Sequence, residues 1–375
     1  MSRQRKPIEE LINLFSANKT LILLHILLSI TVAMACITVL TTSRQHSTQQ
    51  MQTGNPFVTR SGTTLMVKGL PLRLIGYNWS WMGTGCAKPT DAEIDATFSQ
   101  ITTASHGNVI RTAFYQSSSN YGFYTNFDRY IQRAKHYGLY LVPILVNQLV
   151  NCEPAKTMPR SLWYQWGYTQ PNDGYLLSFR TYAIRLAAHY ANEPTIAFWQ
   201  LVNEPDAGPC GAAGAQKLRN FADDMAAALK RVDPNHMVDL GVPGQCAGNT
   251  IADYIWIVSG QGDLCDVWHD YNRIATPLPP QMKERLNACL SLNKPSFVGE
   301  SGICANVDSS WTCSGMITPI SLQQRATLFA AKLDSGLNAG LAGYIIWSKG
   351  NRSVKNDIGY SDPTESVVAQ YTTMS

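Results

Sequence analysis

The sequence predicts an α/β protein that folds as a single (β/α)8 TIM barrel, and three observations support this prediction. Eight short apolar segments alternate singly with amphipathic segments between residues 72 and 347, a pattern typical of parallel strands joined by helices. A barrel of roughly 250 residues fits within the 375 residues of the chain. No Gly-rich phosphate loop follows the first strand, which argues against the rival fold, a doubly wound open sheet.

The first expected element is a membrane anchor. Residues 20–40, TLILLHILLSITVAMACITVL, form an apolar run long enough to span a bilayer. Four basic residues precede this run and one follows shortly after it: Arg3, Arg5, Lys6, Lys19 and Arg44. Because basic residues favour the cytoplasmic side, we expect a cytoplasmic tail at residues 1–19 and a transmembrane signal anchor in the lipid bilayer at residues 20–41. The chain would then be a single-pass protein of the cell membrane with its remainder outside the cytoplasm. Two alternatives are a cleaved secretory signal and a lipoprotein modified at Cys36, which follows Ala-Met-Ala.

A linker and a hairpin come next. Residues 42–56 are polar and rich in Ser, Thr and Gln, which indicates a linker. Polar and apolar residues then alternate around Ser61-Gly62 and Lys68-Gly69, which predicts an N-terminal β-hairpin. We expect residues 57–375 to form one domain.

The strands and helices of the barrel follow from their patterns. The eight expected strands are Leu72–Tyr77, Asn108–Ala113, Leu139–Val146, Thr195–Val202, His236–Val242, Leu264–His269, Ser296–Gly299 and Leu341–Trp347. Capping boxes predict helices that begin after Thr90 and after Ser321. Amphipathic segments predict further helices at Asn126–Tyr137, Tyr175–Tyr190, Ala215–Val232 and Pro280–Leu290. A last short helix is expected to begin at Asp362-Pro363.

Composition excludes several classes of function. The net charge is only +4 and no dense basic tract interleaves with aromatic residues, so nucleic acid is not an expected partner. Beyond Cys36 the chain has an even number of cysteines, none in a CxxC pair, which favours disulfides over a metal site. The pairing of Cys304 with Cys313 closes a short loop and is the one that we expect; the others stay open. We expect no metal, no cofactor and a monomeric chain.

The tripeptide Asn-Glu-Pro occurs at both ends of the fourth expected strand. Pro194 ends the preceding helix, which places Glu193 in the turn at the bottom of the barrel, where we expect a solvated turn residue. Glu204 lies at the carboxyl end of the strand, where barrels of this kind carry their active sites. At a rise of about 3.3 Å per residue, the two carboxylates lie too far apart to serve one site.

Glu300 is the expected partner of Glu204. It lies at the end of the seventh strand, in KPSFVGESG, so both carboxylates would face the same mouth of the barrel. Two carboxyl groups about 5 Å apart suit a retaining glycosidase, in which one protonates the leaving oxygen and the other attacks the anomeric carbon. We expect burial and mutual repulsion to raise the pKa of the acid.

The segments WQLVNEP and FVGESG resemble the two catalytic strands of glycoside hydrolase family 5. The resemblance covers roughly residues 57–372. It implies that Glu204 is the acid/base, that Glu300 is the nucleophile and that Asn203 binds the sugar 2-hydroxyl.

Other segments resemble the same family. The resemblance of VIRTAF implies that Arg111 lies beneath the nucleophile. The resemblance of DVWHDYN implies that His269 contacts sugar hydroxyls and that Tyr271 contacts the nucleophile. The resemblance of GYIIWSKG implies that Trp347 forms the floor of the cleavage subsite. An aromatic- and amide-rich stretch after the first strand adds Asn78 and Trp79 as sugar-binding candidates.

The sequence indicates the type of reaction more clearly than the substrate. LVPILVNQ, which contains Asn147, resembles the β-mannanase branch of the family, whereas Ala113 and Leu149 stand where mannanases carry tryptophan. We therefore expect an endo-β-1,4-mannanase, with a β-1,4-glucanase of the cellulase type as the alternative; exo action and transglycosylation stay open. The alternative of another class is a membrane-tethered, non-catalytic carbohydrate-binding protein. That alternative predicts the loss of one catalytic glutamate, and both are present.

Overall fold

The computed structural model describes residues 54–79, 82, 89–117, 124–147, 158–208, 210–244, 250–306, 320–353 and 355–372. The predicted tail, anchor and most of the linker lie outside these residues, as do Cys36, Leu149 and Cys313. Within the described ranges, no helix is both long and apolar enough to cross a membrane.

The predicted N-terminal hairpin is present and gains a third strand. Strands β1 (Thr59–Ser61), β2 (Thr64–Val67) and β3 (Leu70–Leu72) form an antiparallel sheet in that order. Gly69 connects β2 to β3 with a φ of 80°, a conformation that glycine adopts without steric cost. Leu65 is buried and packs with Leu74 at the start of the barrel. The small sheet thus covers one part of the barrel core.

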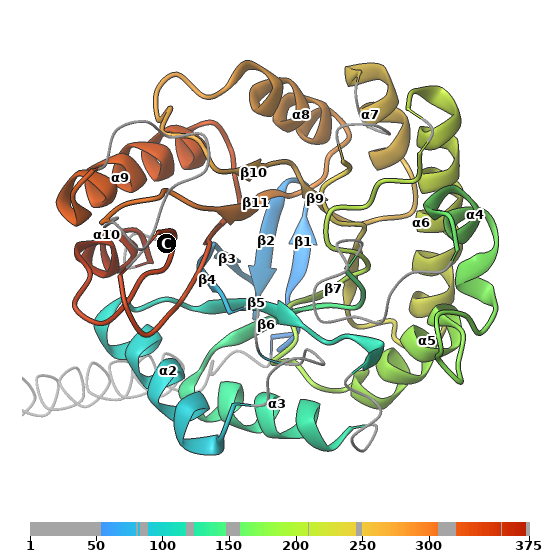
Figure 1. Ribbon diagram of the computed structural model, residues 1–375, viewed down its shortest axis with the longest axis horizontal. Helices are drawn as coiled ribbons and strands as arrows, with labels where there is room; N and C mark the ends of the chain where they lie inside the picture. The colour runs from blue at the N-terminus through green and yellow to red at the C-terminus, as the bar shows by residue number, and fades with distance from the viewer. Residues whose placement is uncertain are drawn as a thin grey trace, which may run out of the picture. The chain divides into compact units, whose positions relative to one another are not determined.

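The larger sheet is parallel and curls into a barrel (Figure 1). Its strands are β4 (Leu74–Asn78), β5 (Val109–Ala113), β6 (Tyr140–Ile144), β7 (Phe198–Gln200), β8 (Met237–Asp239), β9 (Cys265–Asp266), β10 (His269–Asp270), β11 (Ser296–Ser301) and β12 (Gly343–Ile346). Strands β9 and β10 both pair with β11 and are the two halves of one predicted strand, interrupted at residues 267 and 268. The sheet therefore has eight strand positions, as predicted.

Hydrogen bonds join the described residues at the seam between β8 and β9. The Asp263 amide donates to the Val238 carbonyl at 2.8 Å, the Val238 amide donates to Asp263 Oδ2 at 2.9 Å, and the Asp266 amide donates to Asp239 Oδ1 at 3.2 Å. A side chain thus replaces part of the backbone ladder at this position. The polar residues that it brings inside the barrel lie directly beneath the candidate site.

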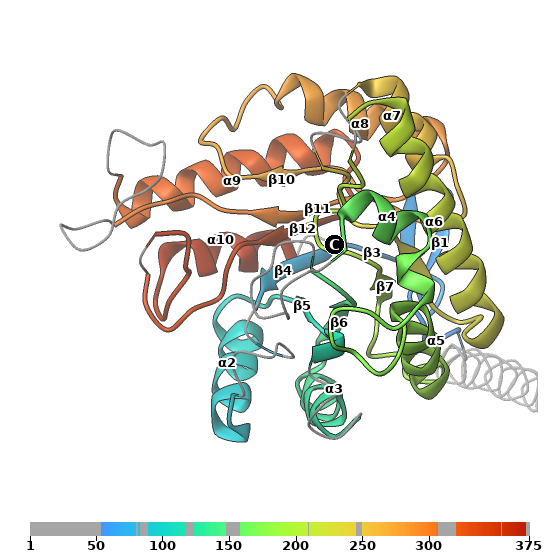
Figure 2. The ribbon, with the colours of Figure 1, turned by 45° about the vertical axis from the view of Figure 1, so that its right-hand side comes forward.

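Helices surround the sheet (Figures 1 and 2). They are α2 (Asp91–Ala104), α3 (Thr125–Tyr137), α4 (Arg160–Gln165), α5 (Phe179–Tyr190), α6 (Ala212–Val232), α7 (Ile251–Val258), α8 (Pro280–Ser291), α9 (Leu322–Asn338) and α10 (Pro363–Thr372). Both predicted capping boxes, at Thr90 and at Ser321, are confirmed. Helix α5 begins four residues later than predicted, because the Ser178 hydroxyl accepts a hydrogen bond from the Thr181 amide and caps the helix there.

Alternation along the strands sorts side chains between two layers. In β5, Val109 packs inside the barrel with Val142 and Phe198. Ile110 packs in the outer layer beneath the helices. Since successive side chains of a strand point to opposite faces, Arg111 points into the barrel, as Val109 does. This places its guanidinium at the carboxyl end of the strand, among the candidate catalytic residues.

The structure contains disulfide-bonded cysteines, as the sequence predicts. Cys265 in β9 is bonded to Cys289 in α8, and Cys210 and Cys304 are also disulfide-bonded. The expected partner of Cys304, Cys313, lies outside the described residues, so that pairing stays a prediction.

Candidate active site

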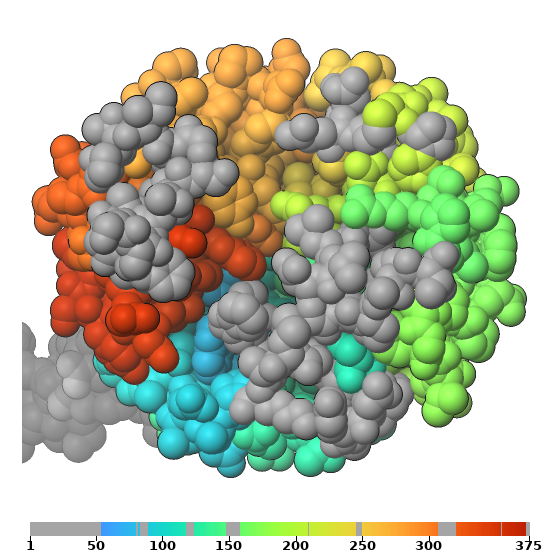
Figure 3. All heavy atoms as spheres, in the orientation of Figure 1, coloured from blue at the N-terminus to red at the C-terminus, as the bar shows by residue number. Residues whose placement is uncertain are grey.

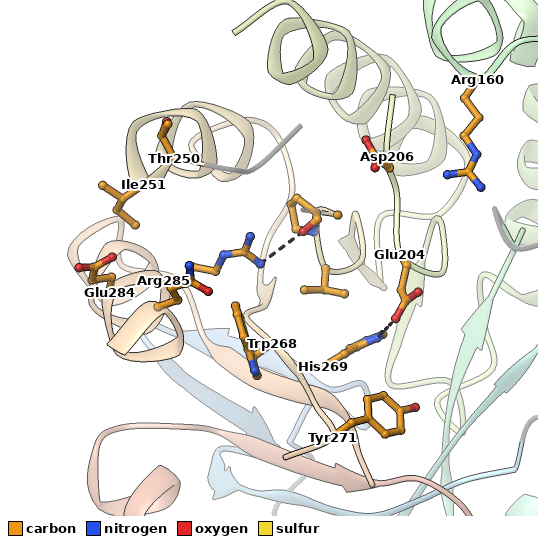
Figure 4. Close-up of a pocket in the computed structure, with 14 residues that line it drawn as sticks. Arg160, Glu204, Asp206, Thr250, Ile251, Trp268, His269, Tyr271, Glu284 and Arg285 are labelled. Atoms are coloured by element: carbon orange, nitrogen blue, oxygen red, sulfur yellow. Dashed lines mark hydrogen bonds and ion pairs between the residues drawn. The ribbon is translucent and has the colours of Figure 1, made fainter. Parts of the chain in front are cut away.

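The two glutamates lie at the carboxyl ends of β7 and β11. Glu300 is within β11, and its register partner in the neighbouring strand is His269 of β10. Glu204 follows β7 by four residues and adopts a φ of 51°, a region that non-glycine residues rarely occupy and that costs free energy unless neighbours hold it. Figure 4 shows His269 pointing at Glu204, with Tyr271 beside them.

Arg111 is the centre of the hydrogen-bond network beneath the glutamates. The side chain is fully buried and donates to four side-chain oxygens: Gln200 Oε1 at 2.7 Å, Asn78 Oδ1 at 2.8 Å, Glu300 Oε1 at 2.7 Å and Asn203 Oδ1 at 2.8 Å. Burial disfavours its charge, but the carboxylates of Glu300 and Asp266 outweigh that cost and raise the pKa of Arg111. The fixed cation therefore orients Glu300 and both asparagines at once.

Glu300 is held at both carboxylate oxygens. Oε1 accepts from Arg111, while Oε2 accepts from the Tyr271 hydroxyl at 2.6 Å and lies 3.4 Å from His269 Nδ1. Burial and the charge of Glu300 raise the pKa of Tyr271, so its hydroxyl keeps its proton and donates. A carboxylate held in this way is suited to act as a nucleophile, since its position is fixed before substrate arrives.

Glu204 differs from Glu300 in both exposure and partners. Its side chain is 32% exposed, and Oε1 accepts a hydrogen bond from His269 Nδ1 at 2.8 Å. This hydrogen bond lowers the pKa of Glu204, although burial opposes the effect. The prediction that burial and repulsion raise the pKa of the acid is therefore wrong for this site, because a protonated histidine lies between the two carboxylates.

His269 carries the positive charge that separates the two glutamates. Burial disfavours its protonation, but Glu300, Asp266 and Glu204 outweigh burial and raise its pKa to about 10. One donor atom each from Glu204, His269 and Glu300 lies within 4.8 Å of the others, a spacing that a cation could use. His269 Nδ1 lies 2.8 Å from Glu204 Oε1 and 3.4 Å from Glu300 Oε2, so we interpret this group as a proton-sharing cluster.

The separation of the carboxylates decides the reaction class that the geometry fits. The nearest oxygens of Glu204 and Glu300 lie within 4.8 Å. Retaining glycosidases have carboxyl groups about 5 Å apart, whereas inverting enzymes need about 6.5–9.5 Å to admit a water molecule. The short separation fits direct attack by one carboxylate and leaves no such gap.

The remaining predicted residues fall into two groups. Asn78 and Asn203 are buried against Arg111, and Asn203 also donates to Asn147 Oδ1 at 3.3 Å. Asn78 further donates to the Gly299 carbonyl at 2.8 Å, so its amide orients neighbours in the barrel. Trp79 packs edge-on against Phe98 in the outer core, with ring centroids 5.9 Å apart; the structure does not bring it to the glutamates.

Trp347 lies at the mouth of the barrel, directly after β12. Its side chain is half-buried, and its backbone amide donates to the Ser301 carbonyl, next to Glu300, at 2.8 Å. This places Trp347 at the same end of the barrel as both glutamates. A partly exposed indole there offers an aromatic face to a ligand.

Sequence reasoning missed three buried polar residues beneath the site: Gln200, Asp239 and Asp266. Each is at most 1% exposed. The Gln200 amide donates to Asp239 Oδ2 at 2.8 Å and to Asp266 Oδ2 at 3.1 Å. The signal that identified Arg111, a charged residue inside an apolar strand, is also present at both aspartates.

A pocket of about 700 Å³ opens beside Glu204. Its lining includes Arg160, Asp206, Trp268 and Arg285, together with Glu204 and His269. Figure 4 shows Arg285 and Trp268 on one side and Asp206 and Arg160 on the other. Figure 3 shows blue and teal atoms recessed near the centre of the molecular face, beside red and orange atoms. The pocket can hold the part of a ligand that lies on the Glu204 side of the cleaved bond.

Comparison with known families decides the chain's membership. Residues 65–350 match the model of the family described as Cellulase (glycosyl hydrolase family 5). The chain belongs to glycosyl hydrolase family 5. The match spans β2 to the residues after β12 and so includes every strand of the barrel.

Curated relatives of this family 5 chain are named as mannosidases. A putative mannan endo-1,4-beta-mannosidase 9 of Oryza sativa subsp. japonica is 27% identical over 217 residues, which are 50% of this chain and 51% of that protein. A mannan endo-1,4-beta-mannosidase 4 of Solanum lycopersicum is 28% identical over 232 residues, 53% of this chain and 56% of that protein. The chain thus spans about half the length of the curated relatives that it matches.

Solved structures support the fold. The endo-1,4-beta-mannanase from Rhizomucor miehei superposes with a TM-score of 0.64 at 18% identity and covers 85% of this chain and 100% of that one. The beta-mannanase from the blue mussel Mytilus edulis has a TM-score of 0.56 at 17% identity, with 84% and 96% covered. At such identities the likeness shows the barrel fold alone and nothing about substrate.

Proposed function

We propose that the chain is a retaining glycoside hydrolase that cleaves β-1,4-linked polysaccharides, with β-1,4-mannan as its substrate. The observation that carries this proposal is the pair Glu204 and Glu300, whose nearest oxygens lie within 4.8 Å at the mouth of the barrel. Family membership supports glycosidic hydrolysis. The names of the curated relatives, endo-1,4-beta-mannosidases, support mannan and endo action.

In this proposal the reaction has two steps. In the first, Glu204 gives its proton to the leaving glycosidic oxygen while a Glu300 oxygen bonds to the anomeric carbon, forming a covalent glycosyl-enzyme. In the second, Glu204 takes a proton from water, the water oxygen bonds to the anomeric carbon, and the bond to Glu300 breaks. Two displacements at the same carbon restore the β configuration.

The electrostatics of the site fit this division of roles. Arg111 and Tyr271 hold Glu300 from below and beside it, so the nucleophile is fixed. Glu204 is the more exposed of the pair and lies beside the pocket, where the leaving group would lie. After Glu204 has given up its proton, the His269 cation stabilises the carboxylate that remains.

The proposal is tested by a hydrolysis panel. The purified chain is incubated with β-mannan, glucomannan, cellulose, xyloglucan and laminarin, and new reducing ends and product lengths are measured. We expect the highest kcat/KM on mannan or glucomannan, with oligosaccharides as early products. Cleavage of cellulose in preference to mannan would instead establish the β-1,4-glucanase alternative, which the Ala113 at the end of β5 favours. Binding without cleavage of any of the five would indicate a carbohydrate-binding protein.

We also propose that residues 20–41 anchor the chain in the cell membrane, with the barrel outside the cytoplasm. The support is the apolar run and the basic residues that precede it. In cells that express the full chain, the protein should stay in the membrane fraction after a carbonate wash, and external protease should digest the barrel. A mature N-terminus near Cys36, found by mass spectrometry, would contradict the anchor.

A further inference from the structure

The two glutamates are joined by a chain of hydrogen bonds beneath the reaction site. From Glu300 it passes to Arg111 and to Gln200, at 2.7 Å for each step. It continues from Gln200 to Asp266 Oδ2 at 3.1 Å. His269 Nε2 lies 3.1 Å from the same oxygen, and His269 Nδ1 lies 2.8 Å from Glu204. Gln200 and Asp266 have not yet been given a role in this chain, and of the two it is Asp266 that contacts the His269 ring.

Asp266 is positioned through contacts on both of its oxygens. Oδ1 accepts from the Gly299 amide at 2.9 Å, and Oδ2 accepts from Gln200 and faces His269. A Cβ atom at residue 299 would lie 2.0 Å from Asp266 Oδ2. Glycine at that position therefore makes room for the carboxylate, one residue before the nucleophile.

The charged groups around His269 come from every strand that packs against it. Glu204 follows β7, Asp266 ends β9, Glu300 lies in β11, and Arg111 in β5 lies beyond Glu300. Glu204 changes its charge during the proposed reaction, and Glu300 becomes an uncharged ester in the intermediate. Asp266 is the carboxylate in contact with the ring that takes no part in the chemistry.

Asp239 lies next to Asp266 in the buried network. Its pKa is raised to about 7 by burial and by the negative charge of Asp266. Asp239 Oδ1 accepts from the Asp266 amide, and its Oδ2 accepts from Gln200 and from the Gly241 amide. Asp239 bonds to the Asp266 amide, to Gln200 and to the Gly241 amide rather than to the imidazole of His269, so it serves as a comparison: an equally buried aspartate in the same network, one step further away.

We propose that Asp266 is a positioning residue that acts through His269: it fixes the imidazole ring and keeps it protonated throughout the catalytic cycle. The ring then always donates through Nδ1 to Glu204 Oε1, which leaves the other oxygen of Glu204 to exchange the proton with the leaving group and with water. This role rests on the proposed glycosidase function, but the protonation of His269 can be measured without substrate.

The primary test is an NMR titration of the histidine ring signals in the full chain, with His269 assigned by the loss of its signal in His269→Asn. In the unaltered protein the His269 midpoint should lie near 10. In Asp266→Asn the amide can still contact Nε2 but carries no charge, so we expect the midpoint to fall by about two pH units. Asp239→Asn should leave the His269 midpoint within a few tenths of a pH unit.

A second variant keeps the test decisive if Asp266→Asn does not fold. Gly299→Ala retains the Asp266 carboxylate but displaces it, so the His269 midpoint should fall here as well. An unchanged midpoint in whichever of these two variants folds would overturn the proposal. Equal falls in Asp239→Asn and Asp266→Asn would also overturn it, because the effect would then be a general loss of the buried network.

Kinetic measurements test the role of Asp266 independently of the NMR titration. In acidic solution His269 stays protonated in Asp266→Asn as well, so the loosened ring should lower kcat/KM without moving its pH profile, and Asp239→Asn should lower it less. A kcat/KM of Asp266→Asn equal to that of the unaltered protein would contradict the positioning role of Asp266. Absence of glycosidase activity in the unaltered protein would overturn the proposed function alone, since the ring titration would still report on Asp266.

Discussion

At the scale of single residues, two glutamates in the same mouth of a barrel differ because their neighbours differ. Glu300 is 5% exposed at its side chain and is held by Arg111 and Tyr271. Glu204 is 32% exposed and shares a hydrogen bond with His269. The buried, immobilised group suits attack on carbon, and the more exposed group suits proton exchange with the leaving oxygen and water.

Replacing either glutamate by its amide should abolish turnover. Glu204→Gln and Glu300→Gln should each lower kcat by at least about a hundredfold, because one cannot supply a proton and the other cannot form the glycosyl-enzyme. Both should still bind oligosaccharide in calorimetry. Glu193→Gln is the matched control: Glu193 lies in the turn before β7, bonded to Thr195 and Lys135, and its variant should keep full activity. Normal turnover in Glu204→Gln or Glu300→Gln would refute that residue's assignment.

The pH dependence of activity should follow Glu204. As the acid of the first step it must be protonated, and the hydrogen bond from His269 holds its pKa below the usual range. We expect kcat/KM, measured between about pH 3 and pH 8, to be highest in acidic solution and to fall toward neutrality. His269→Asn removes the cation, so its residual activity should decline at a higher pH. An alkaline optimum in the unaltered protein would show that His269 does not govern Glu204.

The sequence was sufficient to predict which residues with a local signal meet at the mouth of the barrel. Glu204 and Glu300 each end an apolar strand, and Arg111 is a charge inside one. Asp266 is likewise a charged residue inside an apolar strand. Its segment CDVWHDY also contains His269 and Tyr271, and the family resemblance assigns roles to these two residues and none to Asp266. The reversed pKa shift of Glu204 could not be predicted, because it depends on which ring nitrogen of His269 faces which carboxylate.

At the scale of elements, the sequence did not predict short helices or the interruption of a strand. Helix α7 exposes Ile251, Ile255 and Trp256, so its apolar residues surround the helix and form no single stripe. The sixth predicted strand is split into β9 and β10, which brings Asp266 and His269 to different heights of the barrel. The starts of longer helices with capping boxes, α2 and α9, were predicted correctly.

The disulfide between β9 and α8 should stabilise the fold without contributing to the chemistry. Cys265 and Cys289 are separated by 24 positions, and a link of that length restricts the unfolded chain enough to stabilise the protein by about 3 kcal/mol. Cys265→Ala combined with Cys289→Ala should lose about that free energy of unfolding, measured by urea denaturation, and retain kcat at 25 °C. An unchanged unfolding midpoint would contradict the role of the disulfide.

At the scale of the whole molecule, the barrel brings together residues that are remote in the chain. Arg111 and Glu300 are 189 positions apart, and Glu204 and His269 are 65 apart. The count and order of strands predicted this convergence, since carboxyl ends of parallel strands meet at one mouth. The pocket beside Glu204 was not predicted, because the loops after β7, β8 and β9 that contribute to its lining carry no periodic pattern.

The central claim is that Glu204 and Glu300 lie close enough to make the enzyme retaining. The measurement that tests it most directly is ¹H NMR of the anomeric protons during hydrolysis of the best substrate of the panel. The β anomer of the new reducing end should appear first, and the α anomer should appear only later by mutarotation. Appearance of the α anomer first would mean inversion, and the proposed attack by Glu300 would be wrong.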